Sequence, residues 1–120
     1  MELIWLMFSH WFSDYCLQTE DQAKNKSSNF RKLIEHTSVY SLVMMICSLI
    51  IFTQKEAVWF GASCFIFHTI TDYFSSKFSK IKYQKGQMNG LFGFWSIVGL
   101  DQFLHFVQIY LTYMLIAGGF

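Results

Sequence analysis

Proline is absent from this 120-residue chain, so no segment is forced out of a helix by the pyrrolidine ring. Charged residues are also scarce, at 14%, against roughly 25% in a typical soluble protein. The net charge of +1 provides no basic surface for phosphate groups, so no nucleic-acid partner is expected. The three cysteines, Cys16, Cys47 and Cys64, are odd in number and lie in or beside apolar segments, which argues against a disulfide framework.

Apolar and aromatic residues dominate what is present, at 53% and 20% of the chain. A soluble domain of this size would have to expose much of that surface. The composition therefore predicts a single integral membrane domain over residues 1–120, with the lipid bilayer as its main partner.

Four apolar stretches divide the chain into expected helices: Leu3 to Leu17, Leu33 to Thr53, Ala57 to Phe78 and Leu91 to Ile116. The first is short for a membrane span at ~1.5 Å rise per residue. We therefore expect an all-α fold, a membrane-embedded bundle of four helices with a short first helix.

Basic residues cluster in two of the three connections. Residues 18–32 and 77–90 each carry four Lys or Arg, whereas residues 54–56 carry one. If all four stretches span, the positive-inside rule places both basic connections in the cytoplasm and both termini outside it. This pattern predicts a multi-pass protein of the bacterial inner membrane.

Histidine and aspartate recur together in the apolar stretches. Three pairs are spaced four residues apart, which puts an imidazole and a carboxylate on the same helix face, and a fourth histidine lies near the start of the second stretch. Charged groups facing lipid would cost ~2.5–3.5 kcal/mol each, so we expect them to converge in one inward-facing cavity. The residues are His10 with Asp14, His68 with Asp72, Asp101 with His105, and His36.

Imidazoles and carboxylates form the nitrogen and oxygen ligand set of zinc or manganese, and seven such groups suffice for two ions. The predicted metal ligands are His10, Asp14, His36, His68, Asp72, Asp101 and His105. Catalytic roles are assigned to Asp14, Asp72 and Asp101. Two alternatives stay open for this cluster: a proton or ion relay, and polar side chains that only hold helices together.

The motifs resemble those of an uncharacterised family of small multi-pass membrane proteins in bacteria and their phages, a domain of unknown function. They are His10-x-x-Ser-Asp14-Tyr-x-Leu-Gln18-Thr19, His36-x-x-x-Tyr40, His68-x-x-x-Asp72-Tyr-x-Ser75-Ser-Lys77 and Asp101-Gln102-x-x-His105. The His-x-x-x-Asp spacing is more remotely similar to that of membrane-bound metal-dependent hydrolases. That resemblance implies a metal-activated water that attacks a phosphoester.

The leading hypothesis is a membrane-embedded metal-dependent hydrolase whose site opens to the cytoplasm. Its expected substrate is a phosphoester of an anionic lipid or a nucleotide. We assign substrate contacts to Gln18, Asn25, Lys26 and Gln102. The alternatives are a non-enzymatic phage protein that modifies the host envelope or excludes other phages, and a small transporter or proton relay. A homo-oligomer is compatible with each of them.

Overall fold

The computed structural model describes residues 1–118, and in these residues the secondary structure is helical, without strands. The fold is therefore all-α, as predicted. The elements are α1 (Glu2–Trp11), a π-helical turn η1 (Phe12–Cys16), α2 (Glu20–Asn25), α3 (Phe30–Ser48), α4 (Gln54–Gln84) and α5 (Phe94–Ala117).

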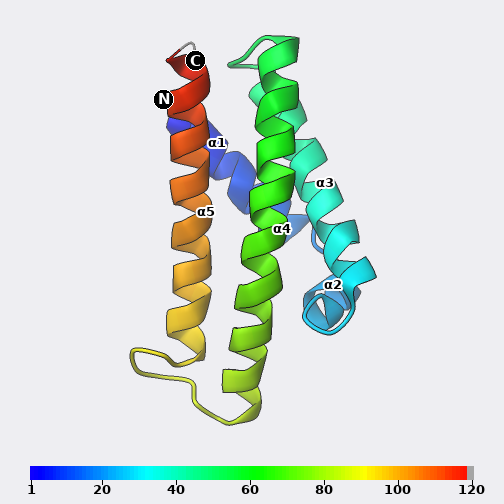
Figure 1. Cartoon of the computed structure of the whole chain (residues 1–120), viewed down its shortest axis with the longest axis vertical. Coiled ribbons are helices and arrows are strands. Elements are labelled where there is room, and N and C mark those ends of the chain that lie inside the picture. Colours follow the sequence, from blue (N-terminus) through cyan, green and yellow to red (C-terminus); the bar gives the residue numbers. More distant parts are fainter. Residues whose placement is uncertain (119–120) are drawn as a thin grey trace.

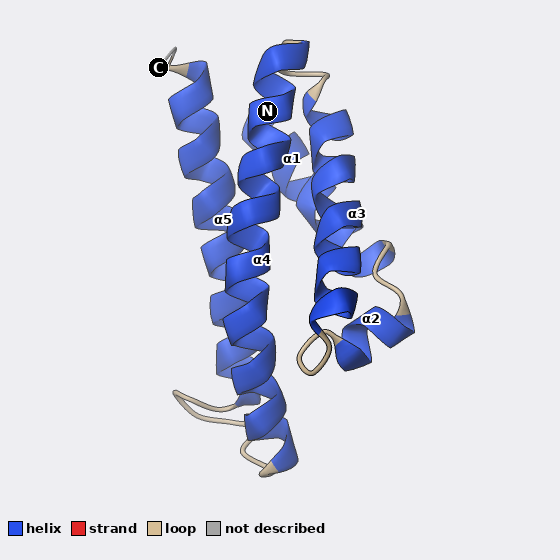
Figure 2. Cartoon of the chain, turned by 45° about the vertical axis from the view of Figure 1, so that its right-hand side comes forward, coloured by secondary structure: helices blue, strands red, loops and turns tan. Residues whose placement is uncertain are grey.

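The longest helix, α4, lies in the middle of the fold and packs against α3 on one side and α5 on the other. Helix α1 crosses behind these three and contacts α3 and α5 (Figure 1). The segment that contains α2 and the connection 85–93 lie toward one end of the bundle, while the termini and the connection 49–53 lie at the other (Figures 1 and 2). The two basic connections thus share one end of the molecule.

Local capping signals explain where the helices begin. Thr19 and Gln22 form a capping box at the start of α2, and Thr53 and Glu56 form another at the start of α4. The side chain of Asn29 accepts a hydrogen bond from the backbone N–H of Arg31 and caps α3. Within the described chain, α2 is an addition to the predicted elements, since residues 18–32 were expected to be a connection.

The apolar core fills the end of the bundle that holds the termini. Gly61 of α4 lies so close to α3 that a Cβ atom there would be 2.8 Å from the Cβ of Met45. Helices α3 and α4 can therefore approach closely at this level. The core residues are Leu6, Tyr40, Met44, Phe52, Ala57, Phe60, Cys64, Ile109 and Ile116.

The expectation of a membrane-embedded bundle is wrong for this structure. Within residues 1–118, none of the helices combines the length and the apolar character that crossing a bilayer requires. Helix α1 has only 10 residues, α3 begins with charged residues, and α4 and α5 carry His, Asp, Gln and Ser at repeated intervals. The predicted multi-pass inner-membrane location and the predicted transmembrane topology, with both termini outside the cytoplasm, are therefore wrong for the described residues.

Candidate metal centre

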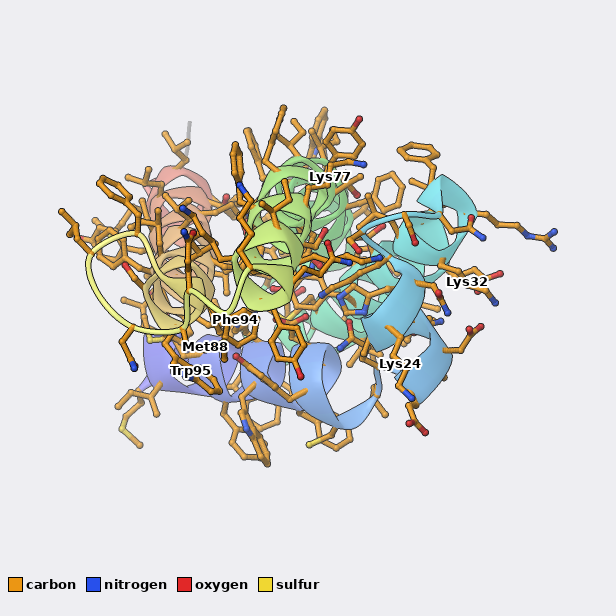
Figure 3. All side chains as sticks on the ribbon, turned by 90° about the horizontal axis from the view of Figure 1, so that it is seen from below. Lys24, Lys32, Lys77, Met88, Phe94 and Trp95 are labelled. Atoms are coloured by element: carbon orange, nitrogen blue, oxygen red, sulfur yellow. The ribbon has the colours of Figure 1, made fainter. Side chains whose placement is uncertain are left out.

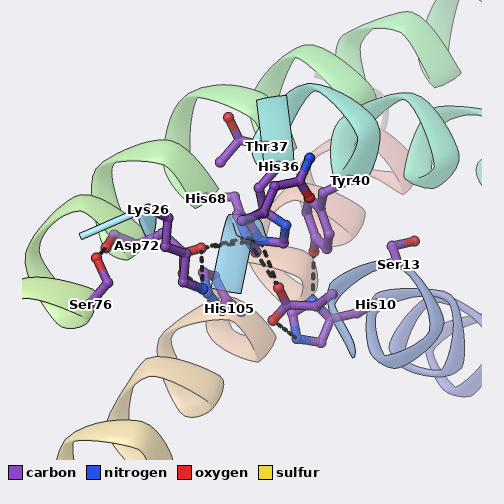
Figure 4. Close-up of polar contacts among 12 residues, drawn as sticks. His10, Ser13, Lys26, His36, Thr37, Tyr40, His68, Asp72, Ser76 and His105 are labelled. Atoms are coloured by element: carbon purple, nitrogen blue, oxygen red, sulfur yellow. Dashed lines mark hydrogen bonds and ion pairs between the residues drawn. The ribbon is translucent and has the colours of Figure 1, made fainter. Parts of the chain in front are cut away.

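Four elements deliver the predicted histidines and aspartates to one buried cluster below the apolar core. The α1–η1 segment provides His10 and Asp14, α3 provides His36, α4 provides the His68–Asp72 pair, and α5 provides the Asp101–His105 pair. Figure 4 shows the histidine rings from different helices directed toward one another. The convergence that the sequence predicted is present in the structure.

The π-helical turn aims Asp14 into the cluster. The hydroxyl of Ser9 donates a hydrogen bond to the backbone carbonyl of Trp5, and the hydroxyl of Ser13 donates to the carbonyl of Ser9. Such bonds to the preceding turn compete with the backbone ladder and bend helices. Widened turns of this kind often occur at functional sites.

The first set of ligand atoms comes from Asp14, His36, His68 and Asp72, all of which are buried. His36 Nε2 lies 3.0 Å from Asp14 Oδ1 and 3.2 Å from Asp72 Oδ2. His68 Nε2 lies 3.5 Å and 3.3 Å from the same two oxygens and 3.3 Å from His36 Nε2. Metal–ligand bonds of 2.0–2.1 Å in a tetrahedron place neighbouring ligands about 3.3 Å apart. These separations therefore fit a single ion.

A second set lies beside the first and consists of Asp14, Asp101 and His105. His105 Nε2 lies 3.3 Å from Asp101 Oδ1 and 3.3 Å from Asp72 Oδ1. Asp72 thus directs one oxygen to the first set and the other to His105, while Asp14 belongs to both sets. Carboxylates shared in this way can bridge two metal ions.

Counting protons distinguishes these contacts from ordinary hydrogen bonds. His36 Nε2 has three partners within 3.3 Å: an oxygen of Asp14, an oxygen of Asp72 and the Nε2 of His68. An imidazole nitrogen carries at most one proton, which it can direct to one acceptor. Several ligand atoms around a common point are instead the arrangement that a bound cation needs, so the residues present fit a divalent metal.

His10 lies outside both sets, although the sequence predicted it as a ligand. Its Nδ1 lies 2.6 Å from the hydroxyl of Tyr40, and its Nε2 lies 2.9 Å from Oε1 of Gln102. Since an amide oxygen only accepts, Nε2 donates to Gln102 and Nδ1 accepts from Tyr40. The amide nitrogen of Gln102 then donates to Asp14 and Asp101, so His10 orients the carboxylates through Gln102.

Burial and mutual pairing set the charges of the cluster. Burial alone would raise the pKa of Asp72, but His68, Lys26, His105 and His36 outweigh it and hold that pKa well below its usual range. Burial would lower the pKa of His105, yet its bonds to the Asp101 and Asp72 carboxylates dominate and raise the pKa to about 10.

The same two effects set the pKa values of Asp14 and His10. Burial would raise the pKa of Asp14, but hydrogen bonds from His36 and His68 keep it well below the usual range. For His10 burial prevails and lowers the pKa to about 4. At neutral pH Asp14 and Asp72 are therefore ionised, His105 is cationic and His10 is neutral.

The family described as Protein of unknown function (DUF3307) matches residues 3–118. The chain belongs to this family. The match bears out the resemblance to a domain of unknown function, and it carries no information about phages, membranes or hydrolases. No curated protein and no solved structure matches the chain. The residues of the His/Asp cluster therefore provide the information on the function of this DUF3307 chain.

A pocket of about 530 Å³ opens beside the cluster in the DUF3307 structure. Asp14, Asp72 and Asp101 form part of its wall, so a molecule in the pocket reaches the candidate ligands. Figure 3 views the bundle from the end near α2 and the connection 85–93. In this view Lys24 of α2 lies to the right of Phe94 at the start of α5, and both residues line the pocket. The polar groups that line the rest of the pocket are Tyr15, Gln18, Lys24, Lys26, Ser27, Ser75, Ser76, Ser79, Lys80, Tyr83, Gln84 and Gln102.

The structure brings three of the four predicted substrate contacts to this pocket. Gln18, Lys26 and Gln102 line it, and Oε1 of Gln18 is buried without a hydrogen-bond partner. Asn25 is not brought to the pocket: its amide donates to the carboxylate and the backbone carbonyl of Asp21 on the surface of α2. A rotation of one residue along α2 separates Asn25 from Lys26.

Among the residues that the sequence did not predict for the site, Tyr40 and Ser75 contact the cluster directly. Tyr40 orients His10 and stacks on His68, with ring centroids 3.8 Å apart. Ser75 donates to Asp101 from the neighbouring helix. Their spacing held a signal, because Tyr40 follows His36 by four residues and Ser75 follows Asp72 by three, the distances that share a helix face.

Proposed function

We propose that this DUF3307 protein is a metal-dependent hydrolase that cleaves a phosphoester in the pocket beside the His/Asp cluster. One observation carries the proposal: imidazole and carboxylate ligand atoms lie 3.0–3.5 Å apart in a buried cluster, and its carboxylates Asp14 and Asp72 reach the wall of an open pocket lined by lysines. The nitrogen and oxygen ligands favour zinc or manganese. The two overlapping ligand sets support two ions.

Asp14, His36, His68 and Asp72 would hold the first ion, and His105 with Asp101 and the shared carboxylates would hold the second. A divalent ion in this place supplies Lewis acidity to a phosphoryl oxygen and acidifies water. Lys26, Lys80 and the hydroxyls of the pocket would bind the remaining phosphate oxygens, since ammonium groups and O–H groups donate to phosphate.

Asp101 is best placed to take a proton. Its side chain is 13% exposed, against 7% for Asp14 and 2% for Asp72, so it is the carboxylate most open to the pocket. Hydrolysis joins the water oxygen to phosphorus and breaks the phosphorus–ester oxygen bond. The proton that the water loses goes to Asp101, which then passes it to the departing oxygen and returns to its ionised form.

The test uses protein stripped of metal, reloaded with zinc or manganese, and assayed with p-nitrophenyl phosphate and bis(p-nitrophenyl) phosphate. We expect turnover of one of them only after metal is added. Asp101→Asn should lower kcat by roughly 10²-fold or more. The control is Glu20→Gln, which removes an exposed carboxylate paired with Lys24 and should keep full activity. Metal-loaded protein that hydrolyses neither compound would end the hydrolase proposal.

A further inference from the structure

Lys26 makes the one ion pair between a lysine or arginine and the His/Asp cluster in the described chain. It follows α2 directly, and its Nζ lies 3.2 Å from Asp72 Oδ2 (Figure 4). Its side chain is mostly buried, with 18% exposed. The contact joins the C-cap residue of a short surface helix to the centre of the bundle.

The oxygen that Lys26 contacts is the one directed at the first set of ligand atoms. Asp72 Oδ2 also lies 3.2 Å from His36 Nε2 and 3.3 Å from His68 Nε2. An ammonium group at that oxygen supplies a positive charge where a metal ion would supply two. The ammonium of Lys26 and a metal ion at Asp72 Oδ2 would repel each other, so this oxygen cannot bind both at full strength.

The open pocket offers the Lys26 ammonium a second position. Lys26 lines the pocket together with Lys24, Lys80 and the serine hydroxyls, and its four-carbon stem is flexible. An ammonium that leaves Asp72 can therefore turn into the pocket and donate hydrogen bonds to an anion there.

We propose that Lys26 exchanges partners: it neutralises Asp72 in the metal-free protein and, once metal occupies that carboxylate, turns into the pocket to bind the phosphoryl group of the substrate. This inference rests on the proposed metal site and adds a residue that couples metal loading to anion binding. The protein would then hold its anion tightly only when the metal is in place.

The first test is the variant Lys26→Met, which keeps the length of the apolar stem and removes the charge. Zinc affinity is measured by competition with a chromophoric chelator, and binding of inorganic phosphate to the zinc-loaded protein is measured by calorimetry. Because a hydrogen bond to a charged group is worth about tenfold or more in affinity, zinc should bind roughly tenfold tighter and phosphate roughly tenfold weaker.

Lys24→Met is the matched control. Lys24 lines the same pocket, but its side chain is 70% exposed and pairs with Glu20 outside the cluster. Its removal should change either affinity by about twofold at most, as for a solvent-exposed ion pair. A purely structural Lys26 would instead weaken both zinc and phosphate binding when it is replaced.

A second measurement needs no variant. Acetylation of lysines, followed by mass spectrometry, should modify Lys26 slowly in the metal-free protein and faster once zinc is bound, and phosphate should protect it again. Lys24 should react at one rate throughout. Zinc binding that leaves Lys26 reactivity and the Lys26→Met affinities unchanged overturns the exchange and leaves the metal site intact. A wild-type protein that binds no zinc overturns both proposals.

Discussion

Removal of metal should lower the melting temperature of the protein. Ionised Asp14 and Asp72 share one set of ligand atoms, Asp14 and Asp101 share the other, and the positive charges of Lys26 and His105 lie beside them. A divalent ion bound only to the folded state adds its binding free energy to stability. Chelation removes that contribution.

The expected shift can be worked out from the size of the chain. At 100 times its dissociation constant, a ligand adds about 2.7 kcal/mol to the free energy of unfolding. With an entropy of unfolding of roughly 2.1 cal/mol/K per residue, a chain of 120 residues has about 0.25 kcal/mol/K. The melting temperature should therefore rise by about 10 °C when metal is restored.

Circular dichroism melts of the stripped protein, with and without zinc or manganese, provide the assay. Asp14→Asn removes the carboxylate common to both ligand sets and should reduce the shift to below about 2 °C. Glu20→Gln should retain the full shift, because Glu20 is exposed and its ion pair is with Lys24, outside the cluster. An identical midpoint with and without metal, in protein shown by elemental analysis to bind none, would refute the reasoning.

Three further outcomes are expected. Gly61→Ala should destabilise the protein by ~1–3 kcal/mol in urea unfolding, because its Cβ would meet α3, whereas Gly99→Ala meets nothing within 4 Å and should stabilise it by up to ~1 kcal/mol. Because His105 has its pKa raised to about 10, it is protonated at pH 7 without metal. Binding releases that proton, and apparent zinc affinity should rise about tenfold per unit between roughly pH 6 and pH 8. Cys64, buried with its pKa raised to about 12, should resist iodoacetamide until the protein unfolds, whereas exposed Cys16 should react at once; equal rates would contradict the core assignment.

The all-α fold and the grouping of the cluster were predictable because both follow from local periodicity. A spacing of four residues fixes the relative direction of His68 and Asp72 whatever the neighbouring helices do. The same holds for Asp101 and His105. The need of buried charges for partners then predicts that such pairs meet, and they do, at 3.3 Å between His105 Nε2 and Asp72 Oδ1.

The roles of Lys26 and Asn25 could not be separated in the same way. Thr19 and Gln22 carry the capping-box signal for α2, but a helix of six residues has no apolar stripe long enough to fix its rotation. Its orientation is set by tertiary contacts. Lys26 reaches Asp72, while Asn25, one position earlier, bonds to Asp21 at the surface.

His10 shows a different limit of sequence reasoning. Its spacing to Asp14 predicts two ligands on one face, yet Asp14 lies within the π-helical turn and the Nε2 of His10 is 3.8 Å from the Asp14 carboxylate. The amide of Gln102 takes that Nε2 instead. Periodicity gives the direction of a side chain, but the identity of its nearest partner depends on a side chain from α5, 92 residues away.

The error about the membrane and the success of the cluster have a common cause. Composition averages over the chain, and with 53% apolar residues it favours a bilayer. Hydropathy along each helix depends on where its polar residues lie, and the His68–Asp72 and Asp101–His105 pairs interrupt the apolar runs of α4 and α5. The same seven residues that lower the hydropathy of the helices also meet in space. Each His or Asp that is buried in the bundle in place of an apolar residue lowers the stability of the fold. A bound cation would offset that cost at all of them together, which is why the metal-dependent melt is the decisive measurement for this protein.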